Sequence, residues 1–384
     1  EISCSLVGSE MCIRDRLMAY MSDRHSSYRY IAGGVRQYIS RDKVFYIVMS
    51  LAMAVFVGLR TSGNDTATYR IAYELIPDNI TAFTEIGWKN LATAPGHEFV
   101  CACLKNLGAS TQDYLMVFAI ASITIYLWFI RKYTTNITLS IYYFITMGIY
   151  TFAMAAIKQT IAVAILLIAT DRAVEKKYPT FILFILLAEL FHPYAFIYLI
   201  IPLMFFTPWT KKTYWLLGGT IVVALLLSRL MGGILAITDA LGGDYSSTEF
   251  LGAGVNIFRV MTVWVPVFLS FCLRENIKKN STRTSNMIIN LSMVNAMIMF
   301  IGMFGTANYF ARLANYFWIF QALALPLILY YFSDLSRRVL KVASVIGYFL
   351  FFFYDQMIAY GSFDNRVNLI TVTEYLKQLF GGSM

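Results

Sequence analysis

Charged residues are scarce in this chain. Only 14% of its 384 residues are Asp, Glu, Lys or Arg, whereas 58% are hydrophobic. Soluble globular domains carry about 25% charged residues, so this composition excludes an ordinary soluble protein. Several apolar runs reach the roughly 20 residues that a helix needs to cross a bilayer. Because lipid offers the backbone no hydrogen-bond partner, we predict an all-α, polytopic integral membrane protein.

Potential metal ligands and nucleophile motifs are also few. The chain has five cysteines and three histidines, and none of them follows the spacing of a zinc or redox site. No serine or cysteine nucleophile motif is present. We therefore expect no metal and no cofactor, and the sequence gives no support for covalent catalysis. The net charge of +9 falls mostly in short loops that set membrane orientation, so it does not indicate nucleic-acid binding.

The first 16 residues are not typical of a fold. Residues 6–15 resemble the translation of a transposase sequencing adapter, so we expect residues 1–16 to be an assembly artefact rather than a signal peptide. A helix that preceded the adapter would then be missing. Residues 17–43 are polar and basic, and this excess of positive charge predicts a cytoplasmic segment.

The remainder is interpreted as one transmembrane helical domain, 44–356, followed by an external tail, 357–384. External loops are expected at 61–112, with a short helix at 66–76, and at 232–254. The other expected spans leave Lys and Arg mostly on the inside. They are 44–59, 113–130, 137–155, 159–173, 214–231, 255–273, 286–304, 313–332 and 339–354.

The apolar run at 181–206 allows two topologies. As one helix it would place Lys211 and Lys212 outside and invert every later loop. As two short limbs broken at His192-Pro193 it keeps both lysines inside, and proline explains the break because it lacks a helix donor. We favour the broken hairpin, which gives roughly eleven membrane segments. Because the limbs are short, a re-entrant pair stays open.

Five ionisable residues stand at or near the ends of apolar runs, and the predicted topology places most of them at the outer face. They are Arg60, Lys158, His192, Arg259 and Arg312. An ionisable side chain in or beside lipid is costly, so it is a functional candidate by default. A cationic cluster at one face favours an anionic, lipid-linked substrate over an ion pore.

Each candidate also has a structural interpretation. Lysine and arginine side chains at helix ends commonly extend to the headgroups, and Asp65 could cap the helix that follows it. His192 could act as acid or base near neutral pH, or it could hold the hairpin tip by a hydrogen bond. Arg259 and Arg312 could each pair with a helix carboxylate.

At these residues the chain resembles the EpsG-type, Wzy-like bacterial polysaccharide polymerases, over most of residues 44–332. Two features depart from the family pattern: lysine replaces the usual arginine at 158, and the family's first helix is absent. The motifs that carry the resemblance are Gly-Leu-Arg60 with Gly63, Asp65 and Tyr69; His97-Glu98-Phe99; Ile157-Lys158-Gln159; Phe191-His192-Pro193; and Arg312 with Tyr316-Phe317.

The resemblance implies a metal-independent glycosyltransferase-type polymerase in the bacterial cytoplasmic membrane. It would transfer a glycan from an undecaprenyl-diphosphate carrier onto a lipid-linked acceptor repeat unit at the outer face. Its expected partners are that lipid-linked oligosaccharide, the bilayer and a chain-length regulator, without nucleic acid. The implied site residues are Arg60, Lys158, Arg259 and Arg312 for pyrophosphate; His192, or else Asp65, for the acceptor proton; and Tyr69, Gln159 and Tyr316 for glycan.

Two other activities stay open. A lipid-linked oligosaccharide flippase would bind the same substrate, but it should need a cationic cavity through the bilayer, whereas these charges gather at one face. A membrane O-acyltransferase could use an intramembrane histidine, but it would not need so many external cations. The sequence also leaves open the sugar, the linkage, the oligomeric state, and whether the product is O-antigen, capsule or exopolysaccharide.

Overall fold

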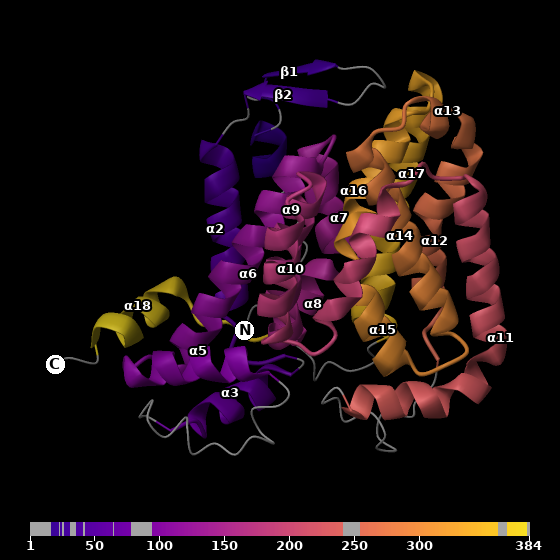
Figure 1. The fold of residues 1–384 in the computed structure, drawn as a ribbon. Coiled ribbons are helices and arrows are strands. Elements are labelled where there is room, and N and C mark those ends of the chain that lie inside the picture. Colours follow the sequence, from indigo (N-terminus) through magenta and orange to yellow (C-terminus); the bar gives the residue numbers. More distant parts are fainter. Residues whose placement is uncertain are drawn as a thin grey trace.

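The computed structural model describes residues 17–22, 24, 27–30, 36–40, 43–63, 65–77, 94–240, 254–359 and 367–381. The predicted adapter segment and part of the loop expected at 232–254 lie outside these residues. The described residues are almost entirely helical, as predicted (Figure 1). Strands β1 (Ser27–Tyr30) and β2 (Arg36–Ser40) form one antiparallel pair within the basic segment 17–43.

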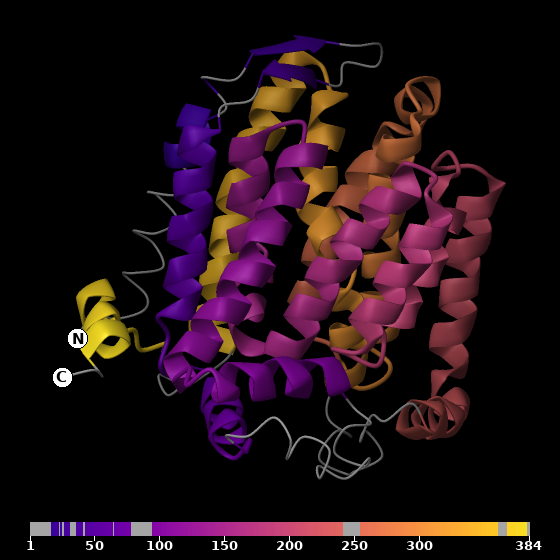
Figure 2. The same ribbon diagram turned by 60° about the vertical axis from the view of Figure 1, so that its left-hand side comes forward.

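Most helices run side by side along one common direction, while α3 and α5 lie together at one end of the bundle (Figures 1 and 2). In chain order they are α2 (Val44–Gly58), α3 (Thr66–Glu74), α5 (Pro95–Asn106), α6 (Thr111–Tyr133), α7 (Ile137–Thr146), α8 (Ile149–Ala155), α9 (Ile157–Val174), α10 (Tyr178–Glu189), the 3-10 helix η2 (Ala195–Phe205), α11 (Lys211–Ala240), α12 (Ile257–Cys272), α13 (Arg274–Lys279), α14 (Arg283–Ile301), α15 (Ala307–Asn315), α16 (Ile319–Tyr330), α17 (Asp334–Phe353), the π-helix η4 (Tyr354–Ala359) and α18 (Val372–Gly381).

The described helices are those of a membrane protein. Three are long and apolar enough to cross a bilayer, namely α6, α14 and α17 continued by η4. Two bent pairs, α7 with α8 (50°) and α15 with α16 (57°), raise the number to five if each pair is one span. The expected count of about eleven is not confirmed, because α2, α10, η2 and α12 are apolar but shorter.

The core lies around α14 and α16. Nearly every residue of α16 is buried, and α14 packs against α11, α12, α15, α16 and η2. By contrast, only 11% of the apolar stretch of α17 is buried inside the protein. An apolar helix that the protein itself leaves uncovered fits contact with lipid, since lipid tails are as apolar as its side chains.

The run at 181–206 forms the predicted broken hairpin. Its limbs are α10 and η2, and the chain turns between them at residues 190–194. Arg283 donates from Nη2 to the Tyr178 hydroxyl (3.1 Å), and its guanidinium lies 3.5 Å from the centroid of the Phe205 ring. Tyr178 begins the first limb and Phe205 ends the second. Because both ends of the hairpin meet one residue, the chain enters and leaves on the same side.

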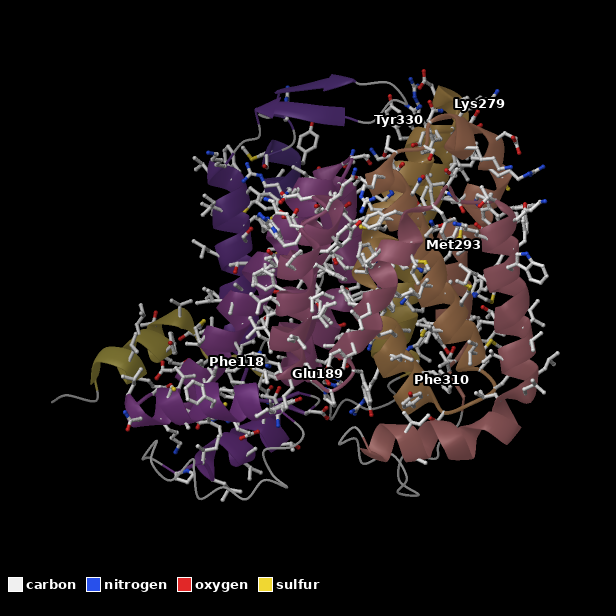
Figure 3. The ribbon with its side chains drawn as sticks, viewed as in Figure 1. Phe118, Glu189, Lys279, Met293, Phe310 and Tyr330 are labelled. Carbon is white, nitrogen blue, oxygen red and sulfur yellow. The ribbon has the colours of Figure 1, made fainter. Side chains whose placement is uncertain are left out.

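The two ends of the bundle carry different groups. Figure 3 shows Lys279 and Tyr330 at one end, which we call the basic end, and Glu189 and Phe310 at the other. We call this other end, where α3, α5 and the hairpin tip lie, the α5 end. Basic residues at the turns of the basic end include Arg131, Lys132, Arg172, Lys177, Lys279 and Arg337. The predicted segregation of loop charge is therefore present in the fold.

The C-terminal segment returns to the beginning of the domain. The Thr61 N–H donates to the Asn368 carbonyl (2.8 Å), and the Ile370 N–H donates to the Leu59 carbonyl (3.0 Å). Gly63, at φ +100°, makes this approach possible, because a Cβ there would lie 2.7 Å from a side-chain atom of the returning segment. The segment at 367–371 thus covers the stretch that carries Arg60.

The hairpin predicts the pattern of labelling in a cysteine-free background. Lys177→Cys and Lys211→Cys should react with a membrane-impermeant maleimide from one side of the membrane, because they flank the two limbs at the basic end. Asn106→Cys, which follows α5 at the α5 end, should react from the other side. Labelling of Lys177→Cys and Lys211→Cys from opposite sides would mean that 181–206 is a single span.

Candidate functional site

A break between α15 and α16 places two of the predicted site residues, Arg312 and Tyr316. The two helices meet at 57°, and such a bend leaves backbone carbonyls without their regular helical partners. Side chains from three other elements donate to these carbonyls. The bonds are Gln159 Nε2 to the Arg312 carbonyl (2.6 Å), Asn295 Nδ2 to the Ala314 carbonyl (2.8 Å) and the Tyr198 hydroxyl to the Tyr316 carbonyl (2.6 Å).

The hairpin tip meets this break through His192. Its Nδ1 lies 2.6 Å from the Tyr316 hydroxyl, and its ring packs edge-on against Tyr194 with centroids 5.4 Å apart. Burial, together with the positive charges of Arg312 and Lys158, lowers the pKa of His192 to about 3. The imidazole is therefore neutral at physiological pH. Because Tyr316 engages Nδ1, a ligand would meet Nε2.

Lys158 holds a carboxylate from α5. Its Nζ lies 2.8 Å from Oε1 of Glu98, which also lies 3.3 Å from Nδ1 of His97. Burial alone would raise the pKa of Glu98, but the hydrogen bond with His97 and the charge of Lys158 outweigh it and lower the pKa to about 2. The Glu98 carboxyl is therefore ionised at neutral pH. Lys158 remains 30% exposed, so an anion can still reach it.

Helix α5 is docked on the hairpin tip by its first turn. The Gly96 N–H donates to the Leu190 carbonyl (2.7 Å), and a Cβ at Gly96 would lie 2.8 Å from the Leu190 side chain. Only glycine permits this approach. Pro95 begins the helix, where its missing N–H costs nothing. The same helix thus contacts the hairpin tip through Gly96 and Lys158 through Glu98.

Arg60 is buried in the protein rather than open to a substrate. It is only 1% exposed, and it donates from Nη1 to the Val57 carbonyl (2.6 Å) and from Nε to Thr66 Oγ1 (3.2 Å). Tyr69 connects this region to Lys158 through a hydrogen bond with the Lys158 backbone. Burial and the charge of Asp65 raise the pKa of Tyr69 to about 12, so its phenol keeps its proton.

Among the described residues, no side-chain hydrogen bond or ion pair that we find connects two of the predicted residues, Arg259 and Asp65, to this group. Arg259 donates from Nε to Asp355 at 2.7 Å, which joins α12 to η4. Pairing with a carboxylate was the structural alternative for this arginine, but sequence analysis did not name Asp355. Asp65 occupies the N-cap position of α3, yet its side chain makes no capping hydrogen bond.

Sequence reasoning gave no role to Glu98, although it quoted the motif that contains it. The sequence did contain a signal, because Lys158 was expected at the outer face and the acidic Glu98 lies in the external loop expected at 61–112. The donors Asn295 and Tyr198 were also missed. Polar side chains inside apolar helices, which need a partner when buried, were the signal that could have found them.

The described part of this group holds two cations, a carboxylate and a neutral imidazole. No set of three or more His, Cys, Asp or Glu side chains able to hold a metal ion occurs among the described residues. Lys158 and Arg312 can bind an anionic group. The neutral His192 beside them can accept a proton. Anion stabilisation and proton transfer are therefore available at one end of the bundle.

A sequence model described as the EpsG family matches residues 43–366, a range that contains every residue of this group. Searches against curated proteins and against solved structures gave no match.

The Glu98–Lys158 pair predicts a pH-dependent contribution to stability. The folded-state pKa of Glu98 lies below its unfolded value, so the contribution is present above about pH 4.5 and is lost as the pH falls towards 2. Glu98→Gln should lower the free energy of unfolding by about 1 kcal/mol at pH 7. Thermal unfolding across this pH range measures the effect.

The matched control for that experiment is Glu275→Gln, which removes an exposed carboxylate paired with Lys278 (3.0 Å) at the basic end. It should leave the melting temperature nearly unchanged. If the wild type and Glu98→Gln melt together at pH 7, the pair makes no net contribution.

Proposed function

This chain belongs to the EpsG family, a family of Wzy-like polymerases, and from this premise we propose that it extends a polysaccharide on a lipid carrier. It transfers a glycan from undecaprenyl diphosphate onto the sugar of a lipid-linked acceptor repeat unit. The α5 end faces outward from the bacterial cytoplasmic membrane, and the basic end with residues 17–43 faces the cytoplasm, which agrees with the positive-inside rule.

One observation carries this proposal: two cations and a neutral imidazole converge at one end of the bundle. Tyr316, one turn after Arg312, bonds to His192, and Gln159, next to Lys158, donates to the Arg312 carbonyl. These contacts connect the three groups although 34 residues separate Lys158 from His192 and 120 separate His192 from Arg312. A reaction that releases a diphosphate needs positive charge where the negative charge develops. It also needs a group that accepts the proton of the attacking hydroxyl.

These groups account for each bond that breaks or forms and for the proton that moves in the proposed step. The bond between the anomeric carbon and the phosphate oxygen breaks, and its electron pair leaves with the diphosphate, which Lys158 and Arg312 stabilise. The acceptor hydroxyl forms the new glycosidic bond, and its proton passes to Nε2 of His192, whose Nδ1–H donates to the Tyr316 hydroxyl. The negative charge of the bound diphosphate offsets the two cations and so makes the imidazole a stronger base during the reaction. Glu98 keeps Lys158 oriented until the diphosphate binds, and the two anions then share the ammonium group.

The geometry narrows the set of residues that we assign to the substrate. Arg60 is buried and Arg259 is paired with Asp355, so neither is given a direct contact with the diphosphate. Gln159 uses its amide to hold the Arg312 carbonyl, and Tyr316 bonds to His192. We therefore assign these two side chains to positioning the reactive groups rather than to binding glycan.

The same geometry favours a polymerase over a flippase. A flippase for an anionic lipid needs charged groups along a path from one side of the membrane to the other. The buried residues of α14 and α16 include amides such as Asn290 and Gln321, but no charged side chain. The cations of the candidate site gather at the α5 end, where a reaction at the membrane surface would take place.

Restoration of polymer in a polymerase-deletion strain from the matching locus tests the proposal. The wild-type protein should restore long glycan chains on a gel. Arg312→Ala and His192→Ala should each lower the rate of polymerisation by ~10²-fold, because each removes transition-state stabilisation. Lys158→Arg should keep activity, because it keeps the charge, and Lys158→Gln should not.

Lys279→Ala, at the exposed basic end, is the matched control for removal of a cation and should keep full activity. Accumulation of single repeat units by a stable, membrane-inserted wild type would count against a polymerase. Equal activity of Arg312→Ala, His192→Ala and wild type would mean that another group performs the reaction.

Tyr316→Phe tests the positioning of His192. Loss of one hydrogen bond to the imidazole should lower kcat by about 10-fold, equivalent to about 1.4 kcal/mol, with little change in KM. A contribution to folding alone would leave kcat per folded molecule unchanged. Tyr194→Phe, whose ring also packs on His192, is the control and should keep kcat. A change in KM alone would mean that Tyr316 binds glycan, as the sequence analysis expected.

A further inference from the structure

Arg60 borders a small cavity at the junction of α2, α6, α8 and α9. The cavity has room for about one water-sized particle. Most of its wall is apolar, including Phe118, which Figure 3 places towards the α5 end. The lining residues are Val57, Arg60, Phe118, Ala119, Ser122, Ala153, Ile157 and Thr160.

The Thr160 hydroxyl at this cavity has no hydrogen-bond partner among the described residues, and the residue is only 1% exposed. A threonine inside a helix commonly donates to the carbonyl one turn earlier. Thr170, on the same helix, does so with the Leu166 carbonyl at 2.9 Å. Thr160 makes no such bond, so its O–H can donate to a ligand in the cavity. A buried hydroxyl without a partner is costly and calls for a ligand.

The buried charge of Arg60 also lacks a counter-charge. Within the part of the chain that the structure describes, its bonds go to a backbone carbonyl and to a threonine hydroxyl, and no carboxylate pairs with it. A guanidinium cannot escape by losing its proton at neutral pH. Taking such a charge out of water is unfavourable unless an opposite charge accompanies it.

We propose that this cavity binds one small inorganic anion, of the size of chloride, between the Arg60 guanidinium and the Thr160 hydroxyl. Both groups donate hydrogen bonds and one is cationic, which matches an acceptor that carries negative charge. The Ser122 hydroxyl already donates to the Phe118 carbonyl at 2.6 Å, so it adds no donor. The apolar walls exclude larger, strongly hydrated anions by size.

Thermal unfolding of the purified full chain in detergent tests this site. Chloride is raised at constant ionic strength by replacing gluconate, which is too large for the cavity. The melting temperature should rise by several degrees and saturate, because a ligand of the folded state stabilises it in proportion to its occupancy. Bromide should have the same effect. An equal melting temperature in chloride and in gluconate would overturn the proposal and leave the cavity to water.

Thr160→Val tests whether the rise in melting temperature comes from chloride bound at this cavity, because valine keeps the shape of threonine and removes the hydroxyl. This variant should need at least ~10-fold more chloride for the same rise, the cost of about one hydrogen bond. Thr170→Val is the matched control and should respond like the wild type. An unchanged chloride response in Thr160→Val would place the anion elsewhere.

Bromide bound to the wild-type protein, seen by anomalous scattering, gives a second measurement that needs no variant. A peak between Arg60 and Thr160 is expected, and peaks at other positions only would mean an adventitious ion only. Neither measurement depends on polymerase activity, so failure of the proposed function would leave this test intact.

Discussion

Backbone carbonyls at the break between α15 and α16 impose the constraint on which the candidate site depends. In an apolar interior each such carbonyl must find a donor or cost several kcal/mol. Here Gln159 of α9 and Tyr198 of η2 donate to the Arg312 and Tyr316 carbonyls. The Ala314 carbonyl accepts from Asn295 of α14 as well as from the Phe317 N–H. The bend that presents Arg312 is thus held by elements far away in sequence. The same hydrogen bonds therefore satisfy the backbone carbonyls and fix the position of Arg312.

A second feature of the site is that its two titratable groups, Glu98 and His192, are held in different charge states. Glu98 stays ionised on Lys158, whereas His192 stays neutral because burial and two nearby cations oppose its protonation. An imidazole that carried its own charge would repel Arg312 and could not accept a proton. The cations that would stabilise a leaving diphosphate thus also keep the imidazole unprotonated before a substrate binds, and the charge of a bound diphosphate would offset their opposition to proton transfer. Arg60 is too deeply buried to share in this directly.

Much of the fold was predictable, because loop charge and apolar length are properties of the sequence itself. The broken hairpin followed from Lys211, Lys212 and Pro193 together with the charge of the later loops, and the short helix expected at 66–76 matches α3. The convergence of Lys158, His192 and Arg312 at one end also follows from counting membrane crossings. Pairings such as Arg259 with Asp355 and Gly96 with Leu190 did not follow, because they depend on the rotation and approach of helices. The burial of Arg60 was missed because a residue at a helix end looks exposed until other segments cover it.

The return of the C-terminal segment has a consequence for the newly made protein. Thr61 bonds to a residue that lies 307 positions later in the chain. At a typical elongation rate this partner is synthesised roughly 15–60 s after Thr61 itself. During that interval the stretch around Arg60 lacks its final cover. The earliest part of the site to be made is therefore the last to be completed, and a protein whose synthesis stops before residue 367 would leave it open.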